Sequence, residues 1–395
     1  MHCIYCFKID PPCGFSDEHI WPNRLGGSLL PKDLFRSDAV CRDCNSKCGL
    51  FVDGPFIKSF TVTNESVASA TAYLDPKKPS AIPLTFLGLT EDVGLEHDEV
   101  CERWLGPAGD HIYFFHKKDR DDWNAFAGGD VLARKGRDKG HAYMCITSAS
   151  QFWQQVALHS FQETFKRAKR LVLNASLSDG REWTTQDYEL VPLPDDKDRT
   201  QQRHMRSINQ LSAPLHQASP IIDGGFDYRF SVKLALGIGS KLFGDDFVGS
   251  DYAMKLRSEL WNANLLDRAT GIKLKPYFSA SEDDTTKNVL SVEGVWTLTL
   301  SKVQKSIVLA VNTPTGKDFG ICLHPDWERC DLRMGYELLQ GQTFLIAPKI
   351  RKMWGPINTT EIVAHNLKVE RSNDVADALS LQTDPDELPS KENGI

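Results

Sequence analysis

Two Cys-x-x-Cys pairs near the N-terminus constrain the fold more than any other feature of this 395-residue chain. Cys3-Ile-Tyr-Cys6 and Cys41-Arg-Asp-Cys44 stand 35 residues apart. A Cys-x-x-Cys turn presents two thiolates to one ion, and two such turns complete the tetrahedral shell of a structural zinc, which leaves no position open for chemistry. The spacing therefore predicts a small N-terminal domain held together by a four-cysteine zinc site.

The ten cysteines of the chain are unevenly distributed, and six of them fall within the first fifty residues. Nothing in the sequence indicates export, and in a reducing compartment paired cysteines more often bind metal or pack than form disulfides. The alternative is that one of the two pairs only packs as small apolar side chains. Cys13 and Cys48 could each replace a zinc ligand, but we treat both as bystanders. The other four cysteines are scattered and are expected to be buried.

An acid and a histidine lie between the two pairs, in the segment Asp17-Glu18-His19-Ile-Trp-Pro-Asn23-Arg-Leu-Gly-Gly27. Adjacent residues of a strand point to opposite faces, so one can hold a cation while the other acts on a water molecule. A neutral imidazole accepts a proton from water at physiological pH, and a hard divalent ion stabilises charge on a phosphate. The pair therefore predicts metal-assisted hydrolysis of a phosphodiester. The alternative is a structural histidine in a zinc-ribbon binding module, with Glu18 as an N-cap or surface acid.

The order of these motifs over residues 1–60 resembles the HNH endonucleases, particularly the branch with two zinc knuckles. The resemblance implies a ββα-metal fold in which the histidine is the general base. It further implies that the acid before the histidine and the residue after the second knuckle hold the catalytic ion. In this chain these are His19 as base, with Glu18 and Asn45 as ligands of Mg²⁺ or Mn²⁺, beside a structural Zn²⁺ on the cysteines.

The chain departs from the family pattern at two places. Asn45 stands where a histidine is commoner, and its amide oxygen is a weaker ligand that suits Mg²⁺ better than a transition metal. Many family members also carry an asparagine shortly before the second knuckle that orients the base, and residues 36–40 contain none. Asp38 and Asn23 are the candidates for that role, and Asp53 is a candidate for a further carboxylate.

The whole sequence predicts an α+β protein, with a small zinc-stapled ββα-metal domain followed by a larger mixed α/β region and a C-terminal antiparallel sheet. Four segments are expected. Residues 1–60 form the nuclease domain, and residues 61–175 form a mixed α+β bracing region that ends in a basic amphipathic helix. Residues 226–368 form a helix-plus-antiparallel-sheet domain for regulation or partner docking, and residues 371–395 form an acidic tail that is disordered.

Periodicity places the regular elements within these segments. Apolar residues at helical spacing predict helices over residues 150–174, 230–243 and 251–262. Alternating patterns predict strands over 142–147, 292–300, 306–312, 319–323 and 343–347.

The net charge of −7 argues against a protein that coats nucleic acid nonspecifically, because that affinity comes from neutralising phosphates. The charge is uneven, however. Residues 101–174 hold twelve basic and eight acidic residues, and residues 371–395 hold two and six. Residues 1–60 hold seven of each. Affinity for DNA is therefore expected from the basic middle region or from a partner.

The cellular setting follows from weaker signals. No apolar run reaches the length of a membrane span and no secretory pattern opens the chain, so we expect a cytoplasmic protein with no membrane partner. The resemblance implies a regulated effector of bacterial antiviral defence. One form is a nuclease that docks on a guide-binding partner such as a short Argonaute, with the acidic tail mimicking nucleic acid. Clean double-strand breaks need two nuclease heads, which would require oligomerisation on activation. The alternative is a noncatalytic zinc-dependent DNA-binding or scaffold protein with a degenerate HNH module.

Overall fold

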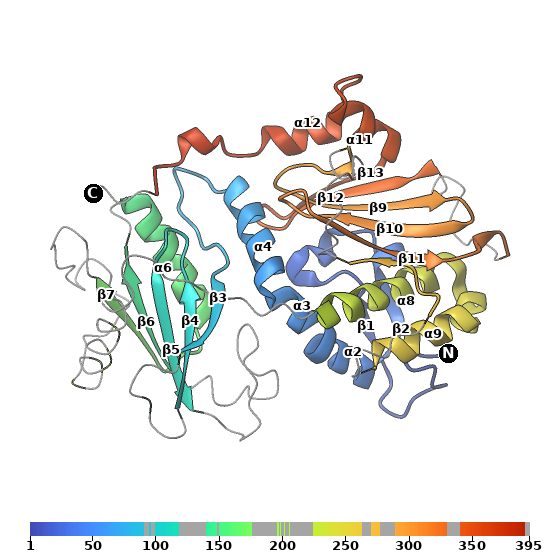
Figure 1. Ribbon diagram of the computed structural model, residues 1–395, viewed down its shortest axis with the longest axis horizontal. Coiled ribbons are helices and arrows are strands. Elements are labelled where there is room, and N and C mark those ends of the chain that lie inside the picture. Colours follow the sequence, from blue (N-terminus) through green and yellow to red (C-terminus); the bar gives the residue numbers. More distant parts are fainter. Residues whose placement is uncertain are drawn as a thin grey trace. The chain divides into compact units, whose positions relative to one another are not determined.

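The computed structural model describes residues 1–90, 95, 99–117, 140–147, 150–175, 196, 198, 201, 205, 224–262, 270–276, 289–329 and 340–391 (Figure 1). The chain forms two compact units. Unit 1 comprises Met1–Ile57, Ala68–Tyr73 and Asp223–Gln382, and unit 2 comprises Lys58–Val67, Leu74–Ile222 and Thr383–Ile395. Among the described helices, none has the length and apolar character needed to cross a membrane. Helices and sheets are mixed in the chain, as predicted.

The N-terminal segment begins with two antiparallel strands, β1 (Phe15–His19) and β2 (Arg36–Cys41). The register shifts between Ser16 and Glu18. Such bulges commonly re-aim side chains beside functional sites. Helix α2 (Arg42–Cys48) follows β2 directly. The order of two strands and a helix is the predicted ββα arrangement.

Short elements complete the segment on either side of β2. The turns η1 (Asn23–Leu25) and η2 (Gly27–Leu29) and the helix α1 (Lys32–Phe35) connect the two strands. After α2 the chain forms a π-helical turn, η3 (Gly49–Asp53), and then α3 (Gly54–Lys58) and α4 (Phe60–Ala72). π-Helical turns are rare and often lie at functional sites.

The Leu-Gly-Gly motif after the histidine is required by close packing. Gly26 has a φ of 90°, and a Cβ added there would lie 2.4 Å from the Ile346 side chain. A Cβ on Gly27 would lie 1.8 Å from the carbonyl oxygen of Trp21. The Trp21 indole in turn donates a hydrogen bond of 2.8 Å to the carbonyl of Leu25. The motif therefore fixes the chain directly after His19.

The C-terminal sheet of unit 1 is antiparallel throughout, as predicted. Its strands run in the order β13 (Lys352–Asn358), β12 (Gln342–Ala347), β9 (Trp296–Val303), β10 (Ser306–Asn312), β11 (Asp318–His324) and β8 (Leu274–Lys275). The four predicted strands correspond to β9 to β12. Strand β13 was missed because its Gly355-Pro356 pair is typical of a turn, and β8 because it has only two residues.

Two helices pack beside this sheet, α8 (Gly224–Val248) and α9 (Asp251–Leu260) (Figure 1). The predicted helix over 230–243 is confirmed but is shorter than α8. Gly244 lies inside α8 with a φ of 66°, so the helix is kinked there and continues to Val248. Helix α8 contacts α1, β2, η3 and β11.

The N-terminal segment does not form a core of its own. The fully buried rings of Trp21, Phe35 and Phe56 pack on aromatic side chains of α8 and the C-terminal sheet. The centroid distances are 5.8 Å for Trp21–Trp296, 5.3 Å for Phe35–Phe344 and 3.7 Å for Phe56–Phe230. The side chains that cover these rings lie more than 170 residues further along the chain. Unit 1 therefore joins residues that the sequence assigned to two successive domains.

The acidic tail also differs from its prediction of disorder. Helices α11 (Thr359–Asn366) and α12 (Asn373–Ser380) and the turn η7 (Pro385–Glu387) are formed in the C-terminal part. Val375 and Ala378 are buried in a cluster with Tyr73 and Trp354. The tail has few apolar residues, but these two are three positions apart and so lie on one helix face. Residues 392–395 lie outside the described part.

Unit 2 is built on a five-stranded sheet in the order β3 (Thr85–Thr90), β4 (Glu99–Leu105), β5 (His111–Lys117), β6 (His141–Ile146) and β7 (Arg170–Ala175). The predicted strand over 142–147 corresponds to β6. Helix α6 (Gln151–Phe165) connects β6 to β7, which is parallel to β6.

The predicted basic helix over 150–174 is therefore wrong in its second half. The helix ends at Phe165, because the apolar run Leu171-Val-Leu173 adds a strand to the sheet. Two of its cations are engaged within unit 2, since Lys166 pairs with Glu163 at 2.7 Å and Arg170 pairs with Asp198 at 2.5 Å. Most of the other basic residues of 101–174 lie in 118–139, outside the described residues.

The close contact between α8 and β1 generates a stability prediction. A Cβ on Gly237 of α8 would lie 2.6 Å from the buried Ile20 side chain, the residue after His19. Overpacking of this kind costs about 1–3 kcal/mol, so Gly237→Ala is expected to lower the melting temperature measured by calorimetry. Gly249→Ala is the control, because a Cβ there meets its nearest atom at 3.5 Å. Equal melting temperatures for Gly237→Ala and the wild type would contradict the packing.

Candidate functional site

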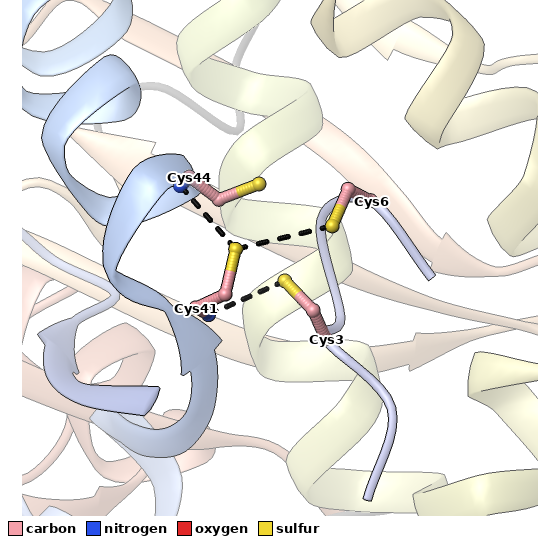
Figure 2. A group of neighbouring side chains, drawn as sticks. All are labelled: Cys3, Cys6, Cys41 and Cys44. Carbon is pink, nitrogen blue, oxygen red and sulfur yellow. Dashed lines mark hydrogen bonds between the residues drawn. The ribbon is translucent and has the colours of Figure 1, made fainter. Parts of the chain in front are cut away.

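The four knuckle cysteines lie together in unit 1 (Figure 2). Their sulfur atoms are all within 4.8 Å of one another, and the Cys6 and Cys41 sulfurs are 3.9 Å apart. Zinc–sulfur bonds of about 2.3 Å give a sulfur–sulfur distance of about 3.8 Å in a tetrahedron. Among the described residues this is the one such cluster of His, Cys, Asp or Glu side chains. The four cysteines therefore fit a structural zinc.

Backbone groups support the sulfur atoms as they do in zinc knuckles. The amide of Cys41 donates to the Cys3 sulfur and the amide of Cys44 donates to the Cys41 sulfur, both at 3.4 Å. A hydrogen bond from the Cys44 thiol lowers the pKa of Cys3 to about 4. Burial raises the pKa of the Cys41 thiol to about 11, and the hydrogen bond with Cys3 raises the pKa of Cys44, so the group without a metal favours one thiolate. Cysteine binds metal as the thiolate, and a cation among the sulfurs would stabilise the others in that form. Cys13 and Cys48 lie outside the cluster, so the bystander interpretation agrees with the geometry.

Helix α9 braces the first knuckle from the C-terminal part of unit 1. The Arg257 guanidinium donates 2.9 Å to the carbonyl of Ile4 and also to the carbonyl of Val248. The Trp261 indole donates 3.0 Å to the carbonyl of Tyr5. These bonds satisfy backbone carbonyls of the Cys3–Cys6 turn that would otherwise be left unpaired in a largely buried place. The zinc site therefore depends on residues far outside the N-terminal segment.

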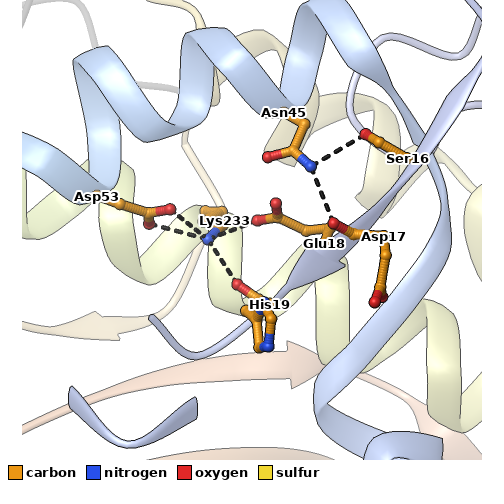
Figure 3. A network of polar contacts seen from close by, with 7 residues as sticks. All are labelled: Ser16, Asp17, Glu18, His19, Asn45, Asp53 and Lys233. Atoms are coloured by element: carbon orange, nitrogen blue, oxygen red, sulfur yellow. Dashed lines mark hydrogen bonds and ion pairs between the residues drawn. The ribbon is translucent and has the colours of Figure 1, made fainter. Parts of the chain in front are cut away.

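The acid and the histidine of β1 point in different directions, as predicted (Figure 3). Glu18 is buried and its Oε1 lies 2.7 Å from the ammonium of Lys233, which α8 contributes. The same ammonium contacts Asp53 at the end of η3, with Nζ–O distances of 2.9 and 2.7 Å. It also donates 3.2 Å to the backbone carbonyl of His19. One buried cation therefore joins three residues of the N-terminal segment.

The electrostatics of this centre follow from burial and from that cation. Burial raises the pKa of Asp53 to about 6, although Lys233 opposes the rise. Burial alone would lower the pKa of Lys233, but the Asp53 and Glu18 carboxylates raise it above its ordinary value. Lys233 is therefore a permanent positive charge of the centre.

His19 is half-buried and paired across the sheet with Arg36. Burial lowers the pKa of His19 below its ordinary value of 6.5, and the positive charge of Lys233 lowers it further. Both effects favour the neutral imidazole, which is the form that accepts a proton. Among the described residues, no hydrogen bond is made to the imidazole ring. The ring is thus free of the pairing that would mark a purely structural histidine.

Asn45 lies on α2 over β1. Its amide nitrogen donates 3.0 Å to the Ser16 hydroxyl and 3.1 Å to the carbonyl of Asp17. These bonds turn the amide oxygen away from the strand backbone (Figure 3). The Glu18 carboxylate and the Asn45 amide supply hard oxygen donors, and Mg²⁺ in proteins is commonly held by one or two carboxylates together with water and phosphate. The donor chemistry therefore fits the expected ion.

The candidates for orienting the base are not brought to it. Asn23 and Asp38 are both exposed, and among the described residues neither has a hydrogen bond or ion pair with His19. Asp53, the candidate for a further carboxylate, faces Lys233 with both oxygens. Lys233 contacts His19 at the backbone carbonyl, so it positions the strand beneath the imidazole.

Sequence reasoning missed two residues of this centre. Arg36 lies opposite His19 and pairs with Asp17. The strand pairing could have indicated Arg36 had the register been known. Lys233 lies 180 residues beyond Asp53 in the chain, and nothing local marks it, because a single lysine in an apolar helix is usually solvated at its tip.

The comparisons with known proteins bear on this same segment. Residues 3–61 match the family model described as HNH endonuclease. The match spans the two knuckles, the acid, the histidine, Asn45 and Asp53, and ends before α8. The searches of curated proteins and of solved structures found no match to the chain. The similarity to a known family thus lies in the N-terminal part of the chain, and we call residues 1–61, which contain this match, the HNH segment.

The zinc site predicts the outcome of cysteine substitutions. Cys41→Ser is expected to remove the zinc, one ion per four-cysteine cluster, and to unfold unit 1, because binding free energy at such sites is folding free energy. Zinc content by mass spectrometry and melting by circular dichroism measure the two effects. Cys13→Ser is the control, since its sulfur lies outside the cluster and contacts the carbonyl of Gly14 at 3.6 Å. Loss of zinc from the Cys13 variant, or its absence from the wild type, would contradict the assignment.

Proposed function

We propose that the protein is a metal-dependent endonuclease that hydrolyses DNA phosphodiester bonds at the HNH segment. The proposal rests on the different directions in which Glu18 and His19 point from β1. Glu18 points inward, the half-buried His19 points away from it, and Asn45 lies above them on α2 (Figure 3). The family match over residues 3–61 supports the same chemistry.

In this proposal the His19 imidazole takes a proton from the attacking water. The lowered pKa of His19 keeps the ring neutral near pH 7, so it accepts a proton without a preceding deprotonation. Glu18 and Asn45 would hold a Mg²⁺ or Mn²⁺ ion, which would supply positive charge to stabilise the phosphate and the leaving oxygen. Lys233 holds the carbonyl of His19 and the carboxylate of Glu18, so both residues keep their directions on the strand.

The zinc has a different task in this proposal. A four-cysteine shell is closed and leaves no coordination position for water or substrate. A zinc ion there would therefore join the Cys3–Cys6 turn to the start of α2, and the chemistry would take place at the oxygen ligands. Cys41 belongs both to β2 and to the zinc site, and α2 starts immediately after it. Zinc binding thus fixes the helix that carries Asn45.

Affinity for DNA is expected from outside the segment, because residues 1–60 carry seven basic and seven acidic residues. A cytoplasmic role in antiviral defence and docking to a guide-binding partner such as a short Argonaute stay predictions, since they rest on the resemblance and on the charge distribution. The acids of the tail are not all available to such a partner. Asp377 accepts a hydrogen bond of 2.7 Å from the Trp354 indole.

The test is cleavage of plasmid DNA by the zinc-loaded chain with Mg²⁺ or Mn²⁺. His19→Ala is expected to lower the rate by about 10²–10⁴-fold, the usual contribution of a general base, and to leave the zinc content unchanged. His2→Ala is the matched control, because His2 is an exposed histidine of the same segment whose ring stacks on Phe7.

Two outcomes would contradict the proposal. Equal rates for the wild type and His19→Ala would remove His19 from the mechanism. Absence of cleavage by the wild type with either ion, together with binding of DNA, would favour the noncatalytic zinc-dependent binding protein.

A further inference from the structure

The ammonium of Lys233 occupies an oxygen cage inside the candidate catalytic centre. Its side chain is fully buried. Four oxygens surround it, from the Glu18 carboxylate at 2.7 Å, both Asp53 oxygens at 2.9 and 2.7 Å, and the His19 carbonyl at 3.2 Å. All of them come from the HNH segment, whereas the cation comes from α8 (Figure 3). Such a cage is an environment suited to a cation, and the protein supplies the cation itself.

Packing holds this cation in place. Gly237 follows Lys233 by one turn of α8, so the two residues lie on the same helix face. The absence of a side chain at Gly237 lets the helix approach Ile20 closely, since a Cβ there would lie 2.6 Å from that side chain. Ile20 directly follows His19. The ammonium is therefore fixed against the strand that carries Glu18 and His19. Because it is buried, it cannot move into solvent without a change in the packing of α8.

The charge of the centre determines how it receives a divalent ion. Two carboxylates and one ammonium give a net charge of −1, and a divalent ion would bring the centre to +1. That ion would share the Glu18 carboxylate with Lys233 and would lie a few ångströms from the ammonium, where like charges in a buried site repel strongly. One phosphate group of a nucleic acid, with a charge of −1, returns the total to zero.

We propose that Lys233 couples metal binding to nucleic-acid binding in this centre. Its ammonium holds the affinity for a divalent ion low in the free protein, and a backbone phosphate of the nucleic acid raises that affinity by supplying the missing negative charge. The inference rests on the proposed function, because it takes Glu18 as a ligand of the ion. By linkage, the metal raises the affinity for the nucleic acid by the same factor.

The test measures binding of Mn²⁺ rather than cleavage. Free Mn²⁺ is followed by electron paramagnetic resonance in titrations of the zinc-loaded full chain, with and without a duplex DNA, in the His19→Ala background so that the DNA stays intact. This parent is expected to bind Mn²⁺ at least tenfold more tightly with DNA. Adding Lys233→Met is expected to tighten Mn²⁺ binding at least tenfold without DNA. The factor by which DNA tightens Mn²⁺ binding is expected to fall by the same amount.

Three further variants separate charge from structure. Lys233→Gln keeps a hydrogen-bond donor near Asp53 but lacks the charge, and it serves where the Met variant does not fold. It is expected to behave like Lys233→Met. Lys233→Arg keeps the charge and is expected to behave like the parent. Lys241→Ala changes a lysine elsewhere on α8, away from the cage, and is also expected to leave Mn²⁺ binding unchanged.

The inference is overturned if the folded Met or Gln variant binds Mn²⁺ as weakly as the parent or more weakly in the absence of DNA. It is also overturned if DNA leaves the affinity of the parent for Mn²⁺ unchanged. Failure of the proposed function gives a different pattern, since the His19-containing chain would then bind Mn²⁺ and DNA without cleaving it.

Discussion

A buried ammonium requires anionic or carbonyl partners, and this requirement ties the two distant parts of unit 1 together. Lys233 of α8 meets Glu18, Asp53 and the His19 carbonyl, all in the HNH segment. Removing either the ammonium or the carboxylates would leave uncompensated charge in the interior, which typically lowers the free energy of unfolding by about 3–5 kcal/mol. The aromatic contacts of Trp21, Phe35 and Phe56 and the bonds from α9 to the first knuckle join the same two parts. The candidate active centre is thus assembled from the N-terminal residues and from a helix in the middle of the sequence.

In the proposed function the four-cysteine site is structural, and the chemistry belongs to a second site of oxygen donors. A zinc ion on the four cysteines would have a closed shell and would join the Cys3–Cys6 turn to the start of α2, while Glu18 and Asn45 would supply oxygen donors to a hard ion. Strand β1 makes this division because successive residues face opposite sides of it. The fixed charge of Lys233 acts on both functions of the strand, since it contacts the acid directly and favours the neutral form of the histidine.

Most of the HNH segment could be predicted from the sequence, because its signals are local. The cysteine spacing, the Glu18-His19 pair and the position of Asn45 after the second knuckle each depend on a few adjacent residues. Strands β9 to β12 were predictable for the same reason, since an alternating pattern of five to nine residues marks them. The grouping into units was not predictable, because it depends on which buried aromatic ring meets which partner across more than 170 residues. Lys233 was missed for this reason as well. The prediction that the basic helix continues to residue 174 was wrong, and the helix ends at Phe165. Residues 170–174 pair with β6 as a strand, and this pairing outweighs their helical pattern.

We expect the HNH segment and helices α8 and α9 to form one cooperative unit around the Lys233 ammonium. Hydrogen exchange followed by mass spectrometry, before and after removal of zinc with a chelator, tests it most directly. Zinc removal is expected to accelerate amide exchange in α8, α9 and β11 together with residues 1–61. Acceleration confined to residues 1–61, with unchanged protection in α8 and α9, would contradict it.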